Sequence, residues 1–138
     1  MMVKIVFCLR RKAGLTPEAF QEYWLTRHAQ LVKDRAKFLG IRRYVQSHTL
    51  HDSRLDHLAR QRGFAGERFD GVAELWFDSA AVLFQSDSAP EVSLRAAQVL
   101  LADEAEFIDL ANSPIFVAQE HEIFDSRWAR SEETTKDK

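Results

Sequence analysis

A histidine inside an amphipathic segment is the residue of this sequence best placed to do chemistry. The stretch FQEYWLTRHAQLV, residues 20–32, has the apolar spacing of a helix, and Phe20, Trp24 and Leu31 lie on one arc of it. His28 lies about 40° beyond Trp24, so we expect it to point at the fold rather than at water. Two interpretations remain open. His28 is either a core histidine satisfied by hydrogen bonds, or an imidazole in a cavity that acts as general base or acid.

Polar residues on a predicted strand could complete an acid–base set with this histidine. Tyr44, Gln46 and His48 alternate along the segment IRRYVQSHTL and therefore share one face. A tyrosine can stabilise a developing oxyanion while histidine moves the proton. We therefore predict that His28, Tyr44 and His48 are catalytic. The alternative is that Tyr44 and His48 only pack at the sheet, with their polar tips bonded.

We predict that five further residues on the helix and the strands bind a substrate: Trp24, Arg27, Glu74, Trp76 and His121. Arg27 could pair with a carboxylate, or cover the edge of the core with its stem. Glu74 could instead be an ordinary buried acceptor for an arginine, and His121 could lie in solvent at a strand end. The faces of separate strands cannot be aligned from sequence, so convergence on His28 is a hypothesis for the structure to test.

The overall composition argues against several classes of protein. Of the 138 residues 46% are hydrophobic and 29% charged, and the net charge of -2 offers no basic excess for nucleic acid or an anionic membrane. No apolar run approaches the roughly 18 residues of a membrane span. The single cysteine, Cys8, allows no internal disulfide and suits a reducing compartment. We expect a cytoplasmic protein.

The sequence offers no standard metal or nucleotide site. The segments HTLHDSRLDH and EHE contain metal-ligand residue types, but at spacings that fit no standard site, and there is no glycine-rich phosphate loop. We therefore expect no metal and no cofactor. The acidic residues of DEAEFID, which are Asp103, Glu104 and Glu106, are explained by a solvated helix face at least as well as by catalysis. Ten phenylalanines, three tryptophans and two tyrosines suit a planar apolar ligand, although they also suit an ordinary core.

The elements that must position these residues follow the order β-α-β-β-α-β. Four β-rich runs, 3–9, 41–50, 72–78 and 113–124, predict strands. A helix is predicted from Pro17 to about Leu39, with Thr16 as its N-cap and Gly40 as its stop signal, and a second over 90–110. Short helices are expected over 53–62 and 79–86. This order specifies an α+β, ferredoxin-like fold: a four-stranded antiparallel sheet with both helices on one face.

The third predicted strand carries apolar residues on both of its faces. Val72 and Trp76 lie on one face, and Ala73, Leu75 and Phe77 lie on the other. Both faces should therefore be covered, and the simplest cover for the free face is a second copy of the chain, which would make a homodimeric barrel. We place this domain at residues 1–125. Residues 126–138 are a charged tail, which we expect to be disordered apart from an anchoring Trp128.

With the elements placed, four stretches resemble the EthD-like family of dimeric α+β barrels. They are LRRKAGLTPEAFQEYWLTRHAQLV, FDGVAELWFDS, DEAEFID and SPIFVAQEHEIF, which occur in the family's order over nearly all of residues 3–124. One departure is Gln30, where relatives usually have proline, so we expect a straighter backbone around His28. The resemblance implies the dimeric barrel fold. Relatives of this barrel include cofactor-free monooxygenases, polyketide cyclases, lactone isomerases and haem-binding proteins, and some fungal members of the EthD branch are linked to decarboxylation or dehydration of aromatic polyketides.

These observations favour a cofactor-independent enzyme with one ligand cavity per subunit. We expect it to decarboxylate, dehydrate, cyclise or isomerise a small aromatic or polyketide-like substrate by proton transfer, as a lyase or isomerase. The competing hypothesis is a non-catalytic protein that binds a small apolar ligand for a neighbouring oxidative degradation enzyme. Haem binding is a third hypothesis. Neither the substrate nor the pathway follows from the sequence.

Overall fold

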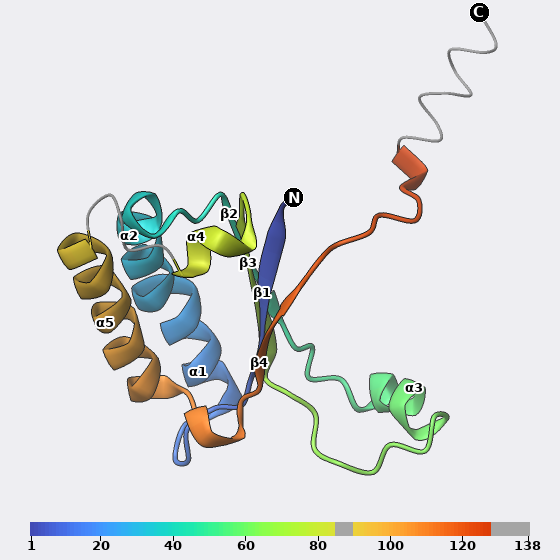
Figure 1. Cartoon of the computed structure of the whole chain (residues 1–138). Coiled ribbons are helices and arrows are strands. Elements are labelled where there is room, and N and C mark those ends of the chain that lie inside the picture. Colours follow the sequence, from blue (N-terminus) through green and yellow to red (C-terminus); the bar gives the residue numbers. More distant parts are fainter. Residues whose placement is uncertain (85–89, 128–138) are drawn as a thin grey trace, which may run out of the picture.

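The chain forms one four-stranded antiparallel sheet with its long helices on a single face (Figure 1). The computed structural model describes residues 1–84 and 90–127. The strands are β1 (Val3–Leu9), β2 (Arg43–His48), β3 (Gly71–Phe77) and β4 (Ile115–Ala118), in the sheet order β2-β3-β1-β4. All neighbouring pairs are antiparallel. Together with the helices between the strands, this is the predicted ferredoxin-like arrangement.

Two helical runs cover the sheet. The first comprises α1 (Pro17–Tyr23), a turn η1 (Trp24–His28) and α2 (Ala29–Leu39), and the second is α5 (Pro90–Phe107). The predicted boundary residues act as expected: the Thr16 hydroxyl accepts the Ala19 amide at 3.1 Å, and Gly40 ends α2 in the left-handed region with φ of 75°. Shorter pieces lie between strands or before β4: η2 (Ser53–Asp56), α3 (His57–Arg60), α4 (Ala80–Phe84) and η3 (Leu110–Asn112).

The first long helix is not regular around His28, contrary to the straight backbone expected from Gln30. Residues 24–28 form a π turn, in which the amide of Ala29 bonds back to the carbonyl of Trp24, five residues earlier. A π turn holds more residues than an α turn, so it rotates the chain less per residue. His28 therefore lies more nearly beneath Trp24 than an α-helical count predicts, and it is only 6% exposed.

The last strand is shorter than predicted. β4 ends at Ala118, which pairs with Lys4, and β1 itself begins only one residue earlier in the chain, at Val3. β4 is an edge strand and β1 is its partner, so the ladder runs out and residues 119–124 leave the sheet (Figure 1). The prediction of a strand to residue 124 was wrong for this reason. The predicted anchor Trp128 lies outside the described residues.

The two faces of the sheet have different cover. On the helix side, Phe7, Leu9 and Ala73 pack with Phe20, Trp24 and Phe107 as the buried core. On the other side of the sheet Figure 1 shows only the short helix α3, which lies away from the strands and does not cover them. The predicted alternation along β3 is confirmed, because Ala73 belongs to this core whereas Trp76 packs against Lys4 and Arg43 of the other face. Within the described ranges, no helix is both long and apolar enough to cross a bilayer.

Candidate functional site

His28 is held by a buried carboxylate from the second long helix. Its Nδ1 lies 2.8 Å from Oδ2 of Asp103 on α5, and both residues are 6% exposed. The imidazole also packs against the ring of Phe107, one turn further along α5, with 5.0 Å between ring centroids. The pair thus joins the π turn to α5 across the interior of the helical layer.

Asp103 receives more than one donor. The hydroxyl of Tyr23 donates to Oδ1 at 2.5 Å, and Nε of the largely exposed Arg27 lies 3.5 Å from the same oxygen. Burial raises the pKa of Asp103, but the hydrogen bonds from Tyr23 and His28 outweigh burial and hold that pKa below its ordinary value. Asp103 is therefore ionised at neutral pH and can only accept hydrogen bonds.

The state of Asp103 fixes the tautomer of His28. Burial lowers the pKa of His28 more than Asp103 raises it, so the ring is neutral near pH 7. Its Nδ1 must carry the proton because the carboxylate opposite can only accept. Nε2 then keeps its lone pair, and no hydrogen bond to Nε2 forms among the described residues. This is the state of an imidazole ready to take a proton.

A small cavity of about 50 Å³ between helices and sheet adjoins this imidazole. It is lined by Phe7, Leu9, Trp24, His28, Val32, Tyr44, Ala73, Leu75, Leu100, Glu104 and Ile108. The polar side chains of this lining are therefore an imidazole, a phenol and a carboxyl in an otherwise apolar wall. His28, Tyr44 and Trp24 thus line one cavity, and their predicted roles in catalysis and binding stay predictions.

His48 contacts residues that neighbour the cavity, but it does not reach the cavity itself. Its ring stacks on Trp24 at 4.4 Å between centroids, and its Nε2 lies 2.8 Å from Oε1 of Gln46. The amide of Gln46 donates in turn to the Tyr44 hydroxyl and to the Trp24 carbonyl, each at 2.8 Å. His48 does not line the cavity, so the structure does not support direct catalysis by it. Burial raises the pKa of Tyr44, which therefore keeps its proton at neutral pH.

Three of the predicted substrate-binding residues do not converge on His28 within one chain. Glu74 and Trp76 lie on the opposite face of the sheet, where Glu74 pairs with Lys4 at 2.5 Å. His121 is exposed beyond the end of β4. Glu74 thus fits the alternative of an ordinary acceptor for a basic side chain, with lysine in place of arginine, and His121 fits the alternative of a histidine in solvent at a strand end. Arg27 is largely exposed; it contacts Asp103 but does not line the cavity.

Asp103 and Glu104 are residues of the candidate site that sequence reasoning did not assign to it. Their helical phase carried the signal: Leu100, Glu104 and Ile108 recur at i, i+4 and i+8, which puts Glu104 in an apolar line. Burial, with a smaller contribution from the charge of Asp103, raises the pKa of Glu104 from 4.5 to about 7. A carboxyl with a pKa of about 7 is about half protonated at neutral pH and can donate a proton, unlike Asp103 beside it.

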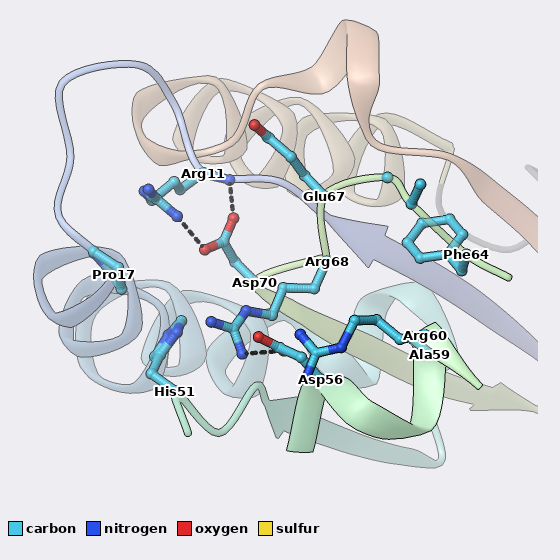
Figure 2. Close-up of a pocket in the computed structure, with 12 residues that line it drawn as sticks. Arg11, Pro17, His51, Asp56, Ala59, Arg60, Phe64, Glu67, Arg68 and Asp70 are labelled. Atoms are coloured by element: carbon cyan, nitrogen blue, oxygen red, sulfur yellow. Dashed lines mark hydrogen bonds and ion pairs between the residues drawn. The ribbon is translucent and has the colours of Figure 1, made fainter. Parts of the chain in front are cut away.

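A larger and more polar hollow, of about 640 Å³, lies by the loop between β2 and β3 (Figure 2). Figure 2 shows that its charges are largely paired with one another: Arg11 donates twice to the buried Asp70, and Arg68 donates to Asp56 at 2.9 Å. The lining holds three arginines, Arg11, Arg60 and Arg68, against three acids, Asp56, Glu67 and Asp70. Opposite charges balance there, so this hollow offers no net field for a charged substrate.

Residues 1–84 and 90–127 contain no metal-binding cluster, that is, no group of three or more histidine, cysteine, aspartate or glutamate side chains able to hold a metal ion. The acid–base residues that line the cavity at His28, together with Asp103, are the candidate site.

Comparison with known proteins identifies the fold and the family. A family model described as the EthD domain matches residues 12–111. An EthD-like protein from Ralstonia eutropha superposes with a TM-score of 0.58 at 15% identity, covering 91% of this chain and 96% of that one. A dimeric ferredoxin-like protein of unknown function from Thermobifida fusca gives 0.55 at 15% identity, covering 87% and 92%. A hydroxynitrile lyase from Passiflora edulis gives 0.53 at 14% identity, covering 90% and 97%. No curated protein matches.

Proposed function

The chain belongs to the EthD family, and on that premise we propose that it binds a small aromatic or polyketide-like molecule and moves protons on it without a cofactor. The observation that carries this proposal is the neutral His28, held through Nδ1 by a buried carboxylate at 2.8 Å, at the wall of an apolar cavity. Decarboxylation, dehydration, cyclisation and isomerisation all need such a proton transfer. A lyase on the same fold, the Passiflora edulis enzyme, is consistent with this class of chemistry.

The roles of the residues follow from their donors and acceptors. His28 takes a proton through Nε2, and Asp103 stabilises the imidazolium that forms. Tyr44 accepts a hydrogen bond from Gln46, which leaves its own hydroxyl proton for an oxygen of the substrate that gains negative charge. Trp24 forms part of the apolar wall, and His48 positions Trp24 by stacking on it.

We also propose that the protein is a homodimer that covers the free face of its sheet. That face carries Val6, Val45, Val72 and Phe116, and Phe116 is 53% exposed in the single chain, whereas Trp76 of the same face is already covered by Lys4 and Arg43. Apolar residues on an uncovered sheet face favour burial against a second copy. The relative from Thermobifida fusca is described as dimeric, which supports the same assembly here.

Hydrogen–deuterium exchange at an activated carbon tests the catalytic proposal directly. The probe is 2-tetralone, a bicyclic ketone with one aromatic ring whose protons beside the carbonyl exchange when a base removes them, followed by NMR in deuterated buffer. We expect the wild-type protein to accelerate exchange and His28→Ala to lose about tenfold or more of that rate. His57→Ala, at an exposed histidine of α3, is the matched control. An equal rate in His28→Ala would refute the mechanism.

The non-catalytic alternative, a protein that binds an apolar ligand for a neighbouring enzyme, has one observation in its favour. A second, larger hollow of about 590 Å³ opens beside the His28 cavity, and most of its lining is apolar. Such a binding protein needs this hollow but no base. Tight binding of 2-tetralone with no acceleration of exchange would favour it over the enzyme.

A further inference from the structure

The cavity at His28 and the larger hollow meet at one carboxyl group. We name the larger hollow the apolar groove; it lies among α2, α4, α5 and the sheet. Both spaces are lined by Phe7, Leu75, Leu100 and Glu104. Glu104 is the sole polar residue of these four, so any molecule that extends from the groove to His28 must pass its carboxyl group.

The small cavity cannot hold a substrate by itself. Its volume of about 50 Å³ is far below the roughly 300 Å³ at which ordinary ligand sites begin, so it has room for a small polar group of a ligand but not for its ring system. The groove, at about 590 Å³, is in the range of ordinary ligand sites. The proposed chemistry at His28 therefore requires a ligand that lies across both spaces.

The lining of the groove favours an apolar ligand. Its walls include Phe38, Ile41, Phe77 and Leu83, and polar side chains are few. The hydroxyl of Ser93 is already used, because it donates to a backbone carbonyl of α2 at 2.9 Å. Lys37 lies at the exposed rim. Glu104 is thus the polar group at the inner end of an apolar space.

We propose that Glu104 is a second catalytic residue, which donates a proton to the carbonyl oxygen of a planar apolar ketone while His28 removes a proton from the adjacent carbon. The rings of this substrate lie in the groove, and its carbonyl end reaches the small cavity. This inference rests on the function proposed for His28 and adds to it the second acid–base group and the class of substrate.

The proposed step balances without a co-reactant. Nε2 of His28 takes the proton from carbon, the electron pair of that C–H bond becomes the new C=C bond, and the carbonyl π pair takes the proton of Glu104. The product is an enol, with an imidazolium at His28 and a carboxylate at Glu104. Where the ketone also has a β,γ C=C bond, the enol is a conjugated dienol. Return of the His28 proton to the γ-carbon, with return of the enol proton to Glu104, then shifts that C=C bond into conjugation and restores both residues.

The charged and titratable groups that face Glu104 support its protonated form. Asp103 precedes it on α5 and is ionised, Tyr44 faces it from β2, and His28 lines the same cavity from η1. Lys37 of α2 lines the groove from its exposed rim, and it is not among the causes that shift Glu104. The carboxyl therefore has a neighbouring negative charge and apolar walls, both of which favour the neutral acid.

Binding of 2-tetralone, measured by calorimetry at about pH 6 and about pH 8.5, tests the inference. The ketone oxygen can only accept a hydrogen bond, so wild-type affinity should fall by about fivefold or more as Glu104 ionises. Glu104→Gln keeps a donor without a titrating proton, so its affinity should not change with pH. At about pH 6 it should bind like wild type but exchange about tenfold more slowly, which separates proton donation from binding.

A matched pair of variants on α5 tests the groove. Ala97 lines the groove and Ala102 does not, and both are exposed on the same helix. We expect Ala97→Phe to fill the groove and weaken binding of 2-tetralone by about tenfold or more, while Ala102→Phe binds like wild type. Equal affinities of these two variants would overturn the placement of the rings.

The other outcomes separate this inference from the function on which it rests. No binding by the wild-type protein would overturn the substrate class. A pH-dependent affinity in Glu104→Gln equal to that of wild type would overturn the role of its carboxyl as donor. Exchange that is lost in His28→Ala but unchanged in Glu104→Gln would refute the present inference alone. Exchange that survives in His28→Ala would refute the proposed function itself.

Discussion

Replacement of Glu104 by glutamine should change how the stability of the protein depends on pH. Burial raises the pKa of Glu104 from 4.5 to about 7 in the folded protein, whereas the unfolded chain titrates near the ordinary value. Between these two pH values the folded state binds the proton more tightly than the unfolded state. The free energy of unfolding of the wild-type protein therefore falls as the pH rises through this window, and Glu104→Gln lacks this loss.

The size of the effect follows from the two pKa values. Each pKa unit of difference between folded and unfolded states corresponds to about 1.4 kcal/mol, so ionisation of Glu104 costs the folded protein about 3 kcal/mol well above pH 7. Below about pH 4.5 this cost is absent in both proteins. Relative to wild type, Glu104→Gln should gain about 3 kcal/mol between about pH 4.5 and about pH 8.5, or roughly ten degrees in Tm.

Urea unfolding, followed by tryptophan fluorescence at one protein concentration over this pH range, measures the difference. Glu106→Gln is the matched control, since Glu106 lies exposed on the same helix two residues further on and its replacement removes the same charge. The control should show little of the pH-dependent gain. If the free energy of unfolding of Glu104→Gln differs from that of wild type by the same amount at every pH, the Glu104 carboxyl is solvated in the folded state. The apolar surroundings where the cavity and the groove meet would then be refuted.

Three other substitutions test other parts of the structure. Asp103→Asn removes the charge that holds the Nδ1 proton of His28, so exchange of 2-tetralone should slow by about tenfold or more by NMR, and urea unfolding should show a loss of about 1–3 kcal/mol. Gly71→Ala would place a Cβ against the ring of Trp24 and 2.7 Å from a backbone oxygen of β2, so urea unfolding should show a loss of about 1–3 kcal/mol. Phe116→Asp charges the free sheet face and should halve the mass seen by light scattering, while a wild-type mass of one chain would refute the dimer.

The fold was predictable because its signals are local. The four strands, the cap at Thr16 and the stop at Gly40 depend on residue types within a few positions of one another, and the structure has each of them. The length of β4 was not predictable in this way. Of the residues after Ala118 only Ile123 and Phe124 favour a strand by type, and whether the segment pairs also depends on how far its partner strand β1 extends. Strand length is therefore a property of the pair, not of the segment.

The site was predicted only in part, for a related reason. Helical and strand periodicity places His28, Tyr44 and Trp24 each on an inner face, and all three line the cavity. Glu74 and Trp76 were assigned to the same site because strand faces cannot be matched by sequence, and the register puts them on the other face. Asp103 and Glu104 were missed because acidic residues in a helix ordinarily face water. Only the contact of α5 with η1 shows that these two face inward.

The π turn explains why residues that do not touch the cavity still matter to it. Gly71 lacks a Cβ where the Trp24 ring lies, His48 stacks on that ring, and the Gln46 amide satisfies the Trp24 carbonyl. Three sheet residues thus hold the start of the π turn by its ring and its backbone, and His28 is the last residue of that turn. The sheet fixes one end of the turn and Asp103 fixes the other, so the imidazole has little freedom to rotate away from the cavity. In the proposed mechanism, a general base held at both ends needs little reorganisation before it reacts, which is what efficient proton transfer requires.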